Sequence, residues 1–361
     1  MFEEQDALRA QGTGQLPGGG FASGPVGRQD AGAVPVAEVW RGGLCESLHF
    51  GHAVVVDASG AVVGAWGNPG AVIYPRSSCK MIQALPLVES GAADAAGLGV
   101  KQLALSCASH SGAAIHAAAV TEWLSGLGLG EGDLRCGAQE PSDIPARDAL
   151  IRAGESPCQI HNNCSGKHSG FLTLNRHLGG GAEYHEVDHP VQRAVRAAFE
   201  EVTGEDVRGW GIDGCSAPNF ATSLQGLARA MAGFAAAREG RGARESAMAR
   251  LRDAMMAHPE MVAGEGRACT ELMRAMGGRA AVKTGAEAVF VAILPEQGLG
   301  MAVKVLDGGT RASEAAITQL LVRYGVLDAD HPAARKRLRA ELRNRRGVLA
   351  AEVRVAAGFG V

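Results

Sequence analysis

The sequence predicts an α/β domain whose antiparallel sheet is built from both ends of the chain, with a helical region inserted between the two halves. Two observations lead to this expectation. Short alternating apolar segments lie near the two termini, whereas the middle of the chain carries amphipathic segments with helical spacing. We therefore expect a sheet lobe formed by residues of about 34–85 and 283–361, and a helical lobe formed by residues of about 86–282.

The first half of the sheet is predicted from three strand-like segments, at residues 36–41, 52–57 and 61–66. Ala58-Ser-Gly60 separates the last two segments and has the composition of a tight hairpin turn. A helix is expected to begin near Ser78, because apolar residues follow it at helical spacing. In the middle of the chain we expect helices at residues 187–202, 223–238 and 243–256.

The second half of the sheet is predicted after residue 283. Apolar segments at 287–294 and 298–306 flank a Pro-Glu-Gln turn, and a helix should follow at 312–324. We expect the tail to form a basic helix at 333–345 and a last strand at 351–355. Residues 1–33 are rich in glycine and lack periodicity, so we expect a disordered N-terminal lead.

Charge and composition exclude several classes of partner. The net charge is −3 and no run of eighteen apolar residues occurs, so neither nucleic acid nor a membrane is an expected partner. The acidic N-terminus has no apolar core of a signal peptide, and the eight cysteines are widely spaced. These features favour free thiols and a cytoplasmic protein.

Lysine is scarce in this chain, with six lysines against twenty-nine arginines. Three of the six, Lys80, Lys167 and Lys283, lie in short motifs rich in Gly, Ser, Cys or Thr. A buried lysine can lose its proton and act as a base or a ligand, which an arginine cannot do. The lysine motifs therefore indicate amine chemistry.

Two of these motifs occur together in the penicillin-recognising serine enzymes. They are Ser77-x-x-Lys80, which places a hydroxyl and an amine one helical turn apart, and Lys283-Thr-Gly285. The simpler interpretation of the first is a helix N-cap beside a solvated lysine. Against it, a Pro-containing turn that leads into a helix is a setting that exposes a nucleophile, and a shielded Lys80 could take the Ser77 proton. Gly285 would let a substrate approach the backbone.

Three further polar segments lie in the predicted helical region: residues 106–112, 161–168 and 213–218. The first packs serines, a thiol and His110 together and is a candidate wall of a polar cleft. The other two hold Cys164 and Cys215, whose spacing fits no zinc-finger pattern. Buried structural thiols are the default interpretation, and a Cys164 nucleophile paired with His161 or His168 is an alternative.

The ordered motifs resemble the rhizobial-type L-asparaginases, which share the serine β-lactamase/transpeptidase-like fold. The resemblance covers residues of about 36–355 and is carried by Arg41–His49, Pro75–Lys80, Gln83–Pro86, Cys107–Gly112, His161–His168, Asp213–Pro218, Val262–Arg267 and Lys283–Glu287. It implies two catalytic pairs, Ser77 with Lys80 and Ser109 with Lys283. It also implies one zinc ion held by Cys164, Lys167 and Cys215, with Arg76, Asp213 and His168 shaping the substrate site.

The resemblance implies hydrolysis of the side-chain amide of L-asparagine to L-aspartate and ammonia. We expect a Ser/Lys-activated acyl-enzyme, with Ser77 favoured over Ser109 as the nucleophile because it lies at a helix N-terminus. Zinc is expected to position the substrate rather than generate the nucleophile, and the protein is expected to be a homodimer. The alternatives are a glutaminase, a penicillin-recognising hydrolase of the same fold, and a non-catalytic zinc-binding protein.

Overall fold

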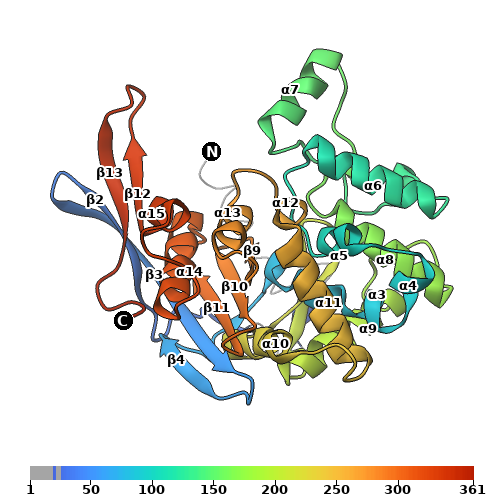
Figure 1. The fold of residues 1–361 in the computed structure, drawn as a ribbon, viewed down its shortest axis with the longest axis horizontal. Coiled ribbons are helices and arrows are strands. Elements are labelled where there is room, and N and C mark those ends of the chain that lie inside the picture. The colour runs from blue at the N-terminus through green and yellow to red at the C-terminus, as the bar shows by residue number, and fades with distance from the viewer. Residues whose placement is uncertain (1–18, 22–25) are drawn as a thin grey trace, which may run out of the picture.

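A computed structural model describes residues 19–21 and 26–361 (Figure 1). Its main feature is an eight-stranded antiparallel sheet with the order β12-β13-β2-β3-β11-β10-β9, in which β4 also pairs with β3. The strands are β2 (Val34–Arg41), β3 (Leu44–Asp57), β4 (Val62–Trp66), β9 (Ala281–Gly285), β10 (Val289–Leu294), β11 (Leu299–Val305), β12 (Arg339–Arg343) and β13 (Leu349–Val355). The predicted sheet from both chain ends, with helices inserted between its halves, is therefore confirmed.

Strand β3 joins the two halves of the sheet. Its first half pairs with β2 and its second half with β4, while β11 pairs along residues 51–57 from the other side. Both β3 and β11 belong to hairpins of alternating or continuous apolar residues, which explains why the sequence identified them. Strand β9 ends the path opposite β12, so Lys283 lies on an edge strand.

The helices gather mainly on the β9 side of the sheet, away from β12 and β13 (Figure 1). The segments are η1 (Arg76–Cys79), α2 (Lys80–Gln83), α3 (Leu85–Glu89), α4 (Ala92–Ala95), α5 (Val100–Ser106), α6 (Ala114–Gly126), η2 (Glu131–Asp133), α7 (Ile144–Ala153), η3 (Gln159–His161), α8 (Ser165–Leu178), α9 (Pro190–Thr203), α10 (Leu224–Ala236), α11 (Ala243–Ala257), α12 (Pro259–Val262), α13 (Ala268–Ala275), α14 (Thr310–Arg323) and α15 (Pro332–Leu338). Helices α9, α10 and α11 match the three predicted in the middle of the chain.

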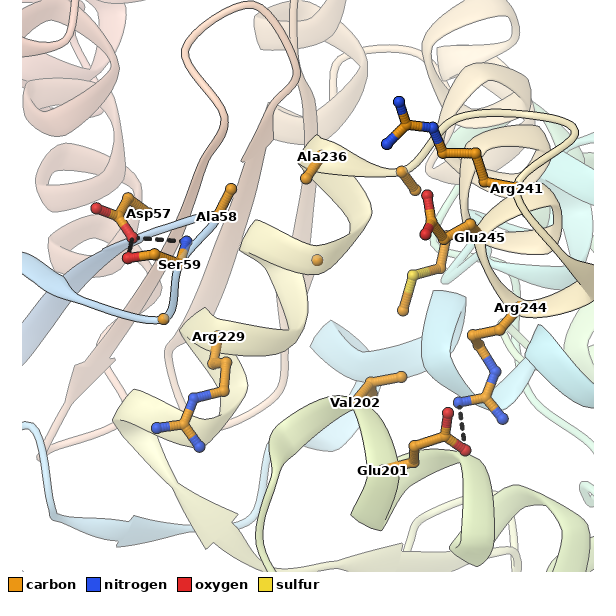
Figure 2. Close-up of a pocket in the computed structure, with 14 residues that line it drawn as sticks. Asp57, Ala58, Ser59, Glu201, Val202, Arg229, Ala236, Arg241, Arg244 and Glu245 are labelled. Carbon is orange, nitrogen blue, oxygen red and sulfur yellow. Dashed lines mark hydrogen bonds and ion pairs between the residues drawn. The ribbon is translucent and has the colours of Figure 1, made fainter.

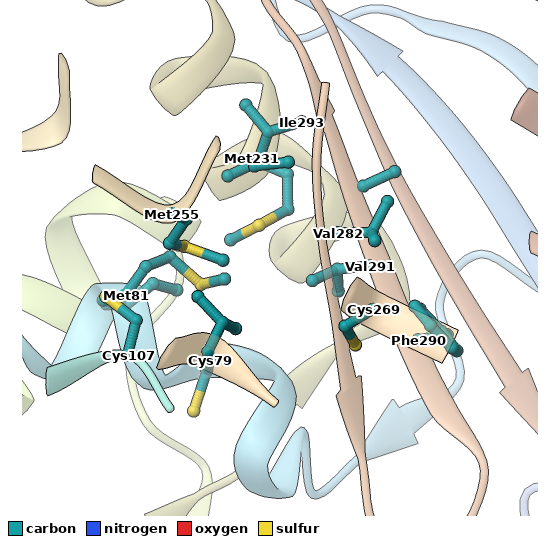
Figure 3. Packing of buried hydrophobic residues seen from close by; sticks show 14 of the residues in the cluster. Cys79, Met81, Cys107, Met231, Met255, Cys269, Val282, Phe290, Val291 and Ile293 are labelled. Atoms are coloured by element: carbon teal, nitrogen blue, oxygen red, sulfur yellow. The ribbon is translucent and has the colours of Figure 1, made fainter. Parts of the chain in front are cut away.

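Two helices pack directly on the sheet. Helix α10 lies against β3, β10 and β11, and α14 lies against β2, β10, β11 and β13. Gly300 allows the close approach of α10, because a Cβ at this position would lie 2.1 Å from the Ala232 nitrogen. Between the helices and β9–β10, the core is filled by flexible sulfur-containing side chains, including the fully buried Met81, Met231 and Met255 (Figure 3).

Two predictions at the chain ends need correction. Residues 339–343 were expected to continue a basic helix, but they form β12, which pairs with β13. Their side chains alternate between exposed and half-buried positions, the period of a strand, and this pairing outweighs the helical propensity of the Arg-rich segment. The second correction concerns the lead.

The lead is not disordered where the structure describes it. Gly20 and Phe21 form β1 and pair with β6 (Gly209–Ile212), which pairs in turn with β7 (Pro218–Phe220). The Gln29 carbonyl also contacts His52 Nε2 at 2.8 Å. Residues 1–18 and 22–25 lie outside the described residues. A two-stranded sheet of β5 (Val72–Ile73) and β8 (Thr222–Ser223) completes the fold. None of the helices described is long and apolar enough to cross a membrane.

Candidate active site

Ser77 and Lys80 lie on the short helical segment that follows β5. Ser77 is half-buried in η1, whereas Lys80, the first residue of α2, is fully buried. Arg76, at the start of η1, has a φ of 52°, a left-handed conformation that is strained for a residue with a side chain. Because Lys80 is buried, it is not the solvated lysine that the N-cap interpretation requires.

Ser109 lies between two buried amines. Its Oγ is 3.0 Å from Lys80 Nζ and 2.8 Å from Lys283 Nζ. Ser109 belongs to the loop after α5 and is only 6% exposed. The loop is held from behind by the Ser109 N–H, which donates to the Val262 carbonyl at 2.9 Å. Three segments that are distant in the sequence thus meet at one hydroxyl.

The two predicted Ser–Lys pairs have different outcomes in this geometry. Ser109 and Lys283 are in direct contact, as the resemblance implied. Lys80, by contrast, donates to Ser109 and to the Ala108 carbonyl, and the described residues show no hydrogen bond between Lys80 and Ser77. The structure therefore describes one amine–hydroxyl–amine chain rather than two separate pairs.

Lys283 occupies the centre of β9, opposite Val291 of β10. Its Nζ also donates to the Thr284 carbonyl at 2.8 Å. Burial lowers the pKa of Lys283 to about 7, and the nearby charge of Lys80 acts in the same direction. A substantial fraction of Lys283 is therefore neutral near neutral pH, the state in which an amine can accept a proton.

Gly285 has a structural role in addition to the predicted one. A Cβ at this position would lie 2.6 Å from the Pro75 carbonyl oxygen and 3.0 Å from the Ser78 nitrogen. The close backbone of Pro75 and of η1 is thus sufficient to require glycine at this position. Gly285 allows β9 to pack closely against the segment that carries Ser77.

A second buried cluster contains Cys164, Lys167 and Cys215. Lys167 Nζ donates to Cys215 Sγ at 2.9 Å, and Lys80 Nζ donates to Cys164 Sγ at 3.0 Å. Lys80 therefore connects this cluster to Ser109. Cys164 and Lys167 lie at the start of α8, and Cys215 lies in the turn between β6 and β7.

The charges in the second cluster stabilise one another. The pKa of Cys215 falls well below its ordinary value because it accepts a hydrogen bond from Cys164, and the charge of Lys167 adds to this effect against the cost of burial. Burial alone would lower the pKa of Lys167, but attraction to Cys215 and Cys164 outweighs burial and raises it. Cys215 is thus favoured as a thiolate beside a lysine ammonium.

Arg76 and Asp213 form an ion pair next to this cluster. Arg76 Nε donates to Asp213 Oδ1 at 2.8 Å. Burial acts to raise the pKa of Asp213, but Lys167 and Arg76 more than offset burial and lower it. Asp213 therefore remains an anion at neutral pH, available to a cationic group of a ligand.

His168 faces the interior of the helical lobe. Its Nδ1 lies 2.8 Å from the Tyr184 hydroxyl, and its Nε2 is buried without a hydrogen-bond partner among the described residues. No sequence motif pointed to Tyr184, which also accepts a hydrogen bond from the Arg135 N–H at 2.9 Å. Tyr184 fixes the orientation of the His168 ring.

The donors of the second cluster fit the implied zinc ion. No group of three or more His, Cys, Asp or Glu side chains gathers as a metal site within residues 19–21 and 26–361, and the third donor of this cluster is a lysine. Two thiols, one of them favoured as a thiolate, form a soft ligand set, which zinc prefers to hard ligands. The unpartnered His168 Nε2 adds a further buried nitrogen on the same helix.

A separate surface pocket of about 590 Å³ lies away from these residues (Figure 2). It is lined by the β3–β4 turn, by residues of α9, α10 and α11, including Arg229 and Arg244, and by Arg241 of the loop between α10 and α11. None of the residues of the two lysine-containing clusters contributes to it.

Comparison with known proteins supports an assignment to a family. A family model described as L-asparaginase II matches residues 37–355, and no curated protein matches the chain. Among solved structures, a beta-lactamase from Mycobacterium bovis is similar, with a TM-score of 0.42, 13% identity, and coverage of 73% of this chain and 89% of that chain. A protein described as a beta-lactamase from Bacteroides dorei has a TM-score of 0.39, 12% identity, and coverage of 71% and 84%.

The family match identifies the chain, because structural similarities with TM-scores this low do not establish a relationship. It extends over nearly all of the described residues and agrees with the resemblance carried by the sequence motifs. The chain therefore belongs to the L-asparaginase II family, a family of amidohydrolases.

Proposed function

We propose that this protein hydrolyses the side-chain amide of L-asparagine to L-aspartate and ammonia through an acyl-enzyme. The family match supports the substrate and the reaction class. The observation that carries the mechanism is the buried chain Lys80–Ser109–Lys283, in which one hydroxyl contacts two amines. Such a chain can accept a proton at one end and deliver it at the other.

Exposure favours Ser77 as the nucleophile and Ser109 as the proton carrier. A nucleophile must reach the substrate, and Ser77 is half-buried whereas Ser109 is 6% exposed. The absence of a direct Ser77–Lys80 bond is compatible with this assignment, because catalytic hydrogen bonds are often loose before substrate binds. Rotation of the Ser77 side chain toward Lys80 is the movement that the proposal requires.

The proposed reaction has two stages. Ser77 Oγ attacks the amide carbon of asparagine and gives its proton to Lys80 as Lys80 passes one of its own through Ser109 to Lys283, whose lowered pKa makes it the acceptor, while backbone N–H groups stabilise the oxyanion. The proton moves through Ser109 to the leaving nitrogen, the C–N bond breaks, and ammonia departs. Water then attacks the ester carbon, and its proton returns through the same chain as Ser77 and L-aspartate are released.

Asp213, Arg76 and His168 are proposed to bind the substrate. The α-ammonium of asparagine requires an anion, and Asp213 is a partly buried carboxylate held in its ionised form. Arg76 carries the opposite charge at the same place and suits the α-carboxylate. The unpartnered Nε2 of His168 is free to contact a ligand.

Cys164, Lys167 and Cys215 are proposed to hold one zinc ion per chain. When bound, the ion would supply positive charge that helps to position the substrate. Lys167 must release its proton to act as a ligand, so binding would be accompanied by proton release. Lys80 contacts both Cys164 Sγ and Ser109 Oγ, so a change in the charge of either group would act on the Lys80 amine.

We also propose a homodimer in a reducing, cytoplasmic setting. The exposed apolar residues Leu48 and Phe50 lie on one face of β3 and suit an interface with a second copy. All eight cysteines are free, as expected for a reducing compartment. Light scattering of wild type and Leu48→Glu would test the dimer, since a charge on this face should favour the monomer.

The direct test of function is ammonia release from L-asparagine by protein purified without chelator. We expect turnover of asparagine, with Ser77→Ala as the inactive control and L-glutamine as the comparison substrate. Equal turnover of glutamine would make the enzyme a glutaminase as well. Failure of correctly folded, zinc-containing protein to release ammonia would contradict the proposal.

A further inference from the structure

His110, the residue after Ser109, has hydrogen bonds that fix its tautomer. It is 1% exposed, and its Nδ1 accepts a hydrogen bond from the Gly112 N–H at 3.2 Å. Its Nε2 lies 3.0 Å from Ser165 Oγ, and that hydroxyl donates its only proton to the Ile160 carbonyl. Ser165 must therefore accept from His110, and the ring is neutral with its proton on Nε2.

These contacts connect the Ser109 loop to the first turn of α8. The His110 N–H also donates to the Asn163 carbonyl at 3.1 Å, so backbone and side chain of one residue bind the same segment. Gly112 leaves little room for the loop to shift, because a Cβ there would lie 2.9 Å from the His161 carbonyl oxygen. The segment contacted is the one that presents Cys164 and Lys167.

A second histidine supports the ring of His110 from the other side. His116 stacks on it with a centroid distance of 4.8 Å and an interplanar angle of 15°. His116 is anchored at 2.8 Å to the Glu260 carbonyl, two residues before the Val262 carbonyl that holds Ser109. Burial, and then the neighbouring His116, lower the pKa of His110 well below its ordinary value.

We propose that His110 is a positioning residue that fixes Ser109 Oγ between Lys80 and Lys283 through its Nε2–H bond to Ser165. The inference rests on the proposed role of Ser109 in proton transfer. His110 does not contact the reacting atoms in this account. It sets the distance between the Ser109 loop and α8, and so keeps the two lysine-containing clusters in a fixed relative position.

Two substitutions separate the two bonds of the ring. In His110→Gln the longer amide can still donate to Ser165, whereas in His110→Asn the shorter amide reaches only the Nδ1 position, next to Gly112. We expect His110→Asn and Ser165→Ala each to lower kcat by about 10- to 100-fold, the range expected for a misplaced group, with KM changed by less than about twofold. His110→Gln should retain kcat within about threefold.

The double variant and a matched control distinguish positioning from general destabilisation. His110→Asn combined with Ser165→Ala should be no worse than either single change, because both remove the same bond. Thr173→Val breaks a buried α8 bond to Trp123 Nε1 (3.0 Å in the structure) and should lower Tm without lowering kcat. Full kcat in His110→Asn, or losses that multiply in the double variant, would overturn the proposal.

Nitrogen-15 NMR of the histidine rings provides a test that does not depend on activity. Wild type should show a neutral imidazole protonated at Nε2, absent from both His110 variants. Assignment of His110 as the Nδ1–H tautomer, or as a cation at neutral pH, would contradict the inference. If the protein does not turn over asparagine, the proposed function fails. The tautomer of His110 still tests its role in that case. So does a comparison of the Tm of His110→Asn, of Ser165→Ala and of the double variant, which shows whether the two changes are coupled.

Discussion

Lys283 and Lys167 are both almost fully buried, yet their surroundings shift their pKa values in opposite directions. Lys283 is 1% exposed and lies beside a second lysine, so burial and repulsion together lower its pKa to about 7. Lys167 is 2% exposed and lies beside Cys215 and Cys164, whose attraction outweighs burial. Because the two amines are buried to a similar degree, their different partners decide which one more readily loses its proton.

The difference assigns separate tasks to the two clusters. A lysine that is partly neutral at pH 7 can exchange protons with Ser109 during a reaction. A lysine held beside a thiolate is a poor base, but it becomes a ligand when a metal ion displaces its proton. Lys80 contacts both clusters, through Ser109 Oγ and Cys164 Sγ, and is the physical link between them.

The largest expected effect comes from the two serines. Ser77→Ala should abolish turnover of every substrate, because no covalent intermediate can form. Ser109→Ala should lower asparagine turnover by about 10²- to 10⁴-fold, the range for general acid–base catalysis, while an activated β-ester of L-aspartate is still hydrolysed. The ester needs no protonation of its leaving group. Steady-state kinetics with both substrates decides the assignment, and the reverse pattern would make Ser109 the nucleophile.

The thiol cluster should determine metal content. Cys215→Ser and Cys164→Ser should each lose most of the zinc found in wild type, because removing one of three protein ligands weakens the site. Cys136→Ser is the matched control: this thiol is also buried, and burial raises its pKa to about 12. Elemental analysis of protein purified without chelator measures the difference. Equal zinc in wild type and Cys215→Ser would remove the metal from the account.

A smaller effect is expected from pH. If neutral Lys283 is needed as a base, kcat should fall below about pH 7, at most tenfold per unit, because protonation then removes the acceptor. A pH–rate profile with asparagine tests this expectation. The acidic limb should vanish from the residual activity of Lys283→Met. A wild-type profile that is flat between pH 5 and pH 8 would exclude Lys283 as the essential base.

The smallest effect concerns stability. Lys283 has a lower pKa in the folded protein than in the unfolded chain, so between about pH 7 and its ordinary value of 10.5 only the unfolded chain binds the proton. The free energy of unfolding should therefore rise with pH across this window. In Lys283→Met the slope should be smaller, which denaturant titrations at several pH values would show. An unchanged slope would indicate that Lys283 has an ordinary pKa.

The sequence predicted the architecture well because its signals were local. Alternating apolar residues identified most strands at both chain ends, and 3.6-residue periodicity identified α9, α10 and α11. Strand β12 was missed because Arg339–Arg343 has a helical composition, and only pairing with β13 makes it a strand. The β1–β6 pairing was missed for the same reason, since Gly20 and Phe21 alone carry no strand signal.

The site was predicted less completely because its contacts span long distances in the sequence. The motifs singled out the right lysines, but Ser109 is 29 residues from Lys80 and 174 from Lys283, and no local pattern shows that it contacts both. The need for glycine at position 285 depends on the carbonyl of Pro75, in another segment. The tautomer of His110 follows from its contact with Ser165, a residue distant in the sequence that lies near His110 only in the folded protein.

The most direct test of the comparison is the titration of Lys283 itself. The side-chain amine can be followed by NMR of lysine-labelled protein, because the chain has only six lysines and the spectrum of Lys283→Met identifies the resonance. The account predicts that Lys283 titrates near pH 7, well below the ordinary lysine value of 10.5. A Lys283 resonance that titrates near that ordinary value of 10.5 would contradict the central claim.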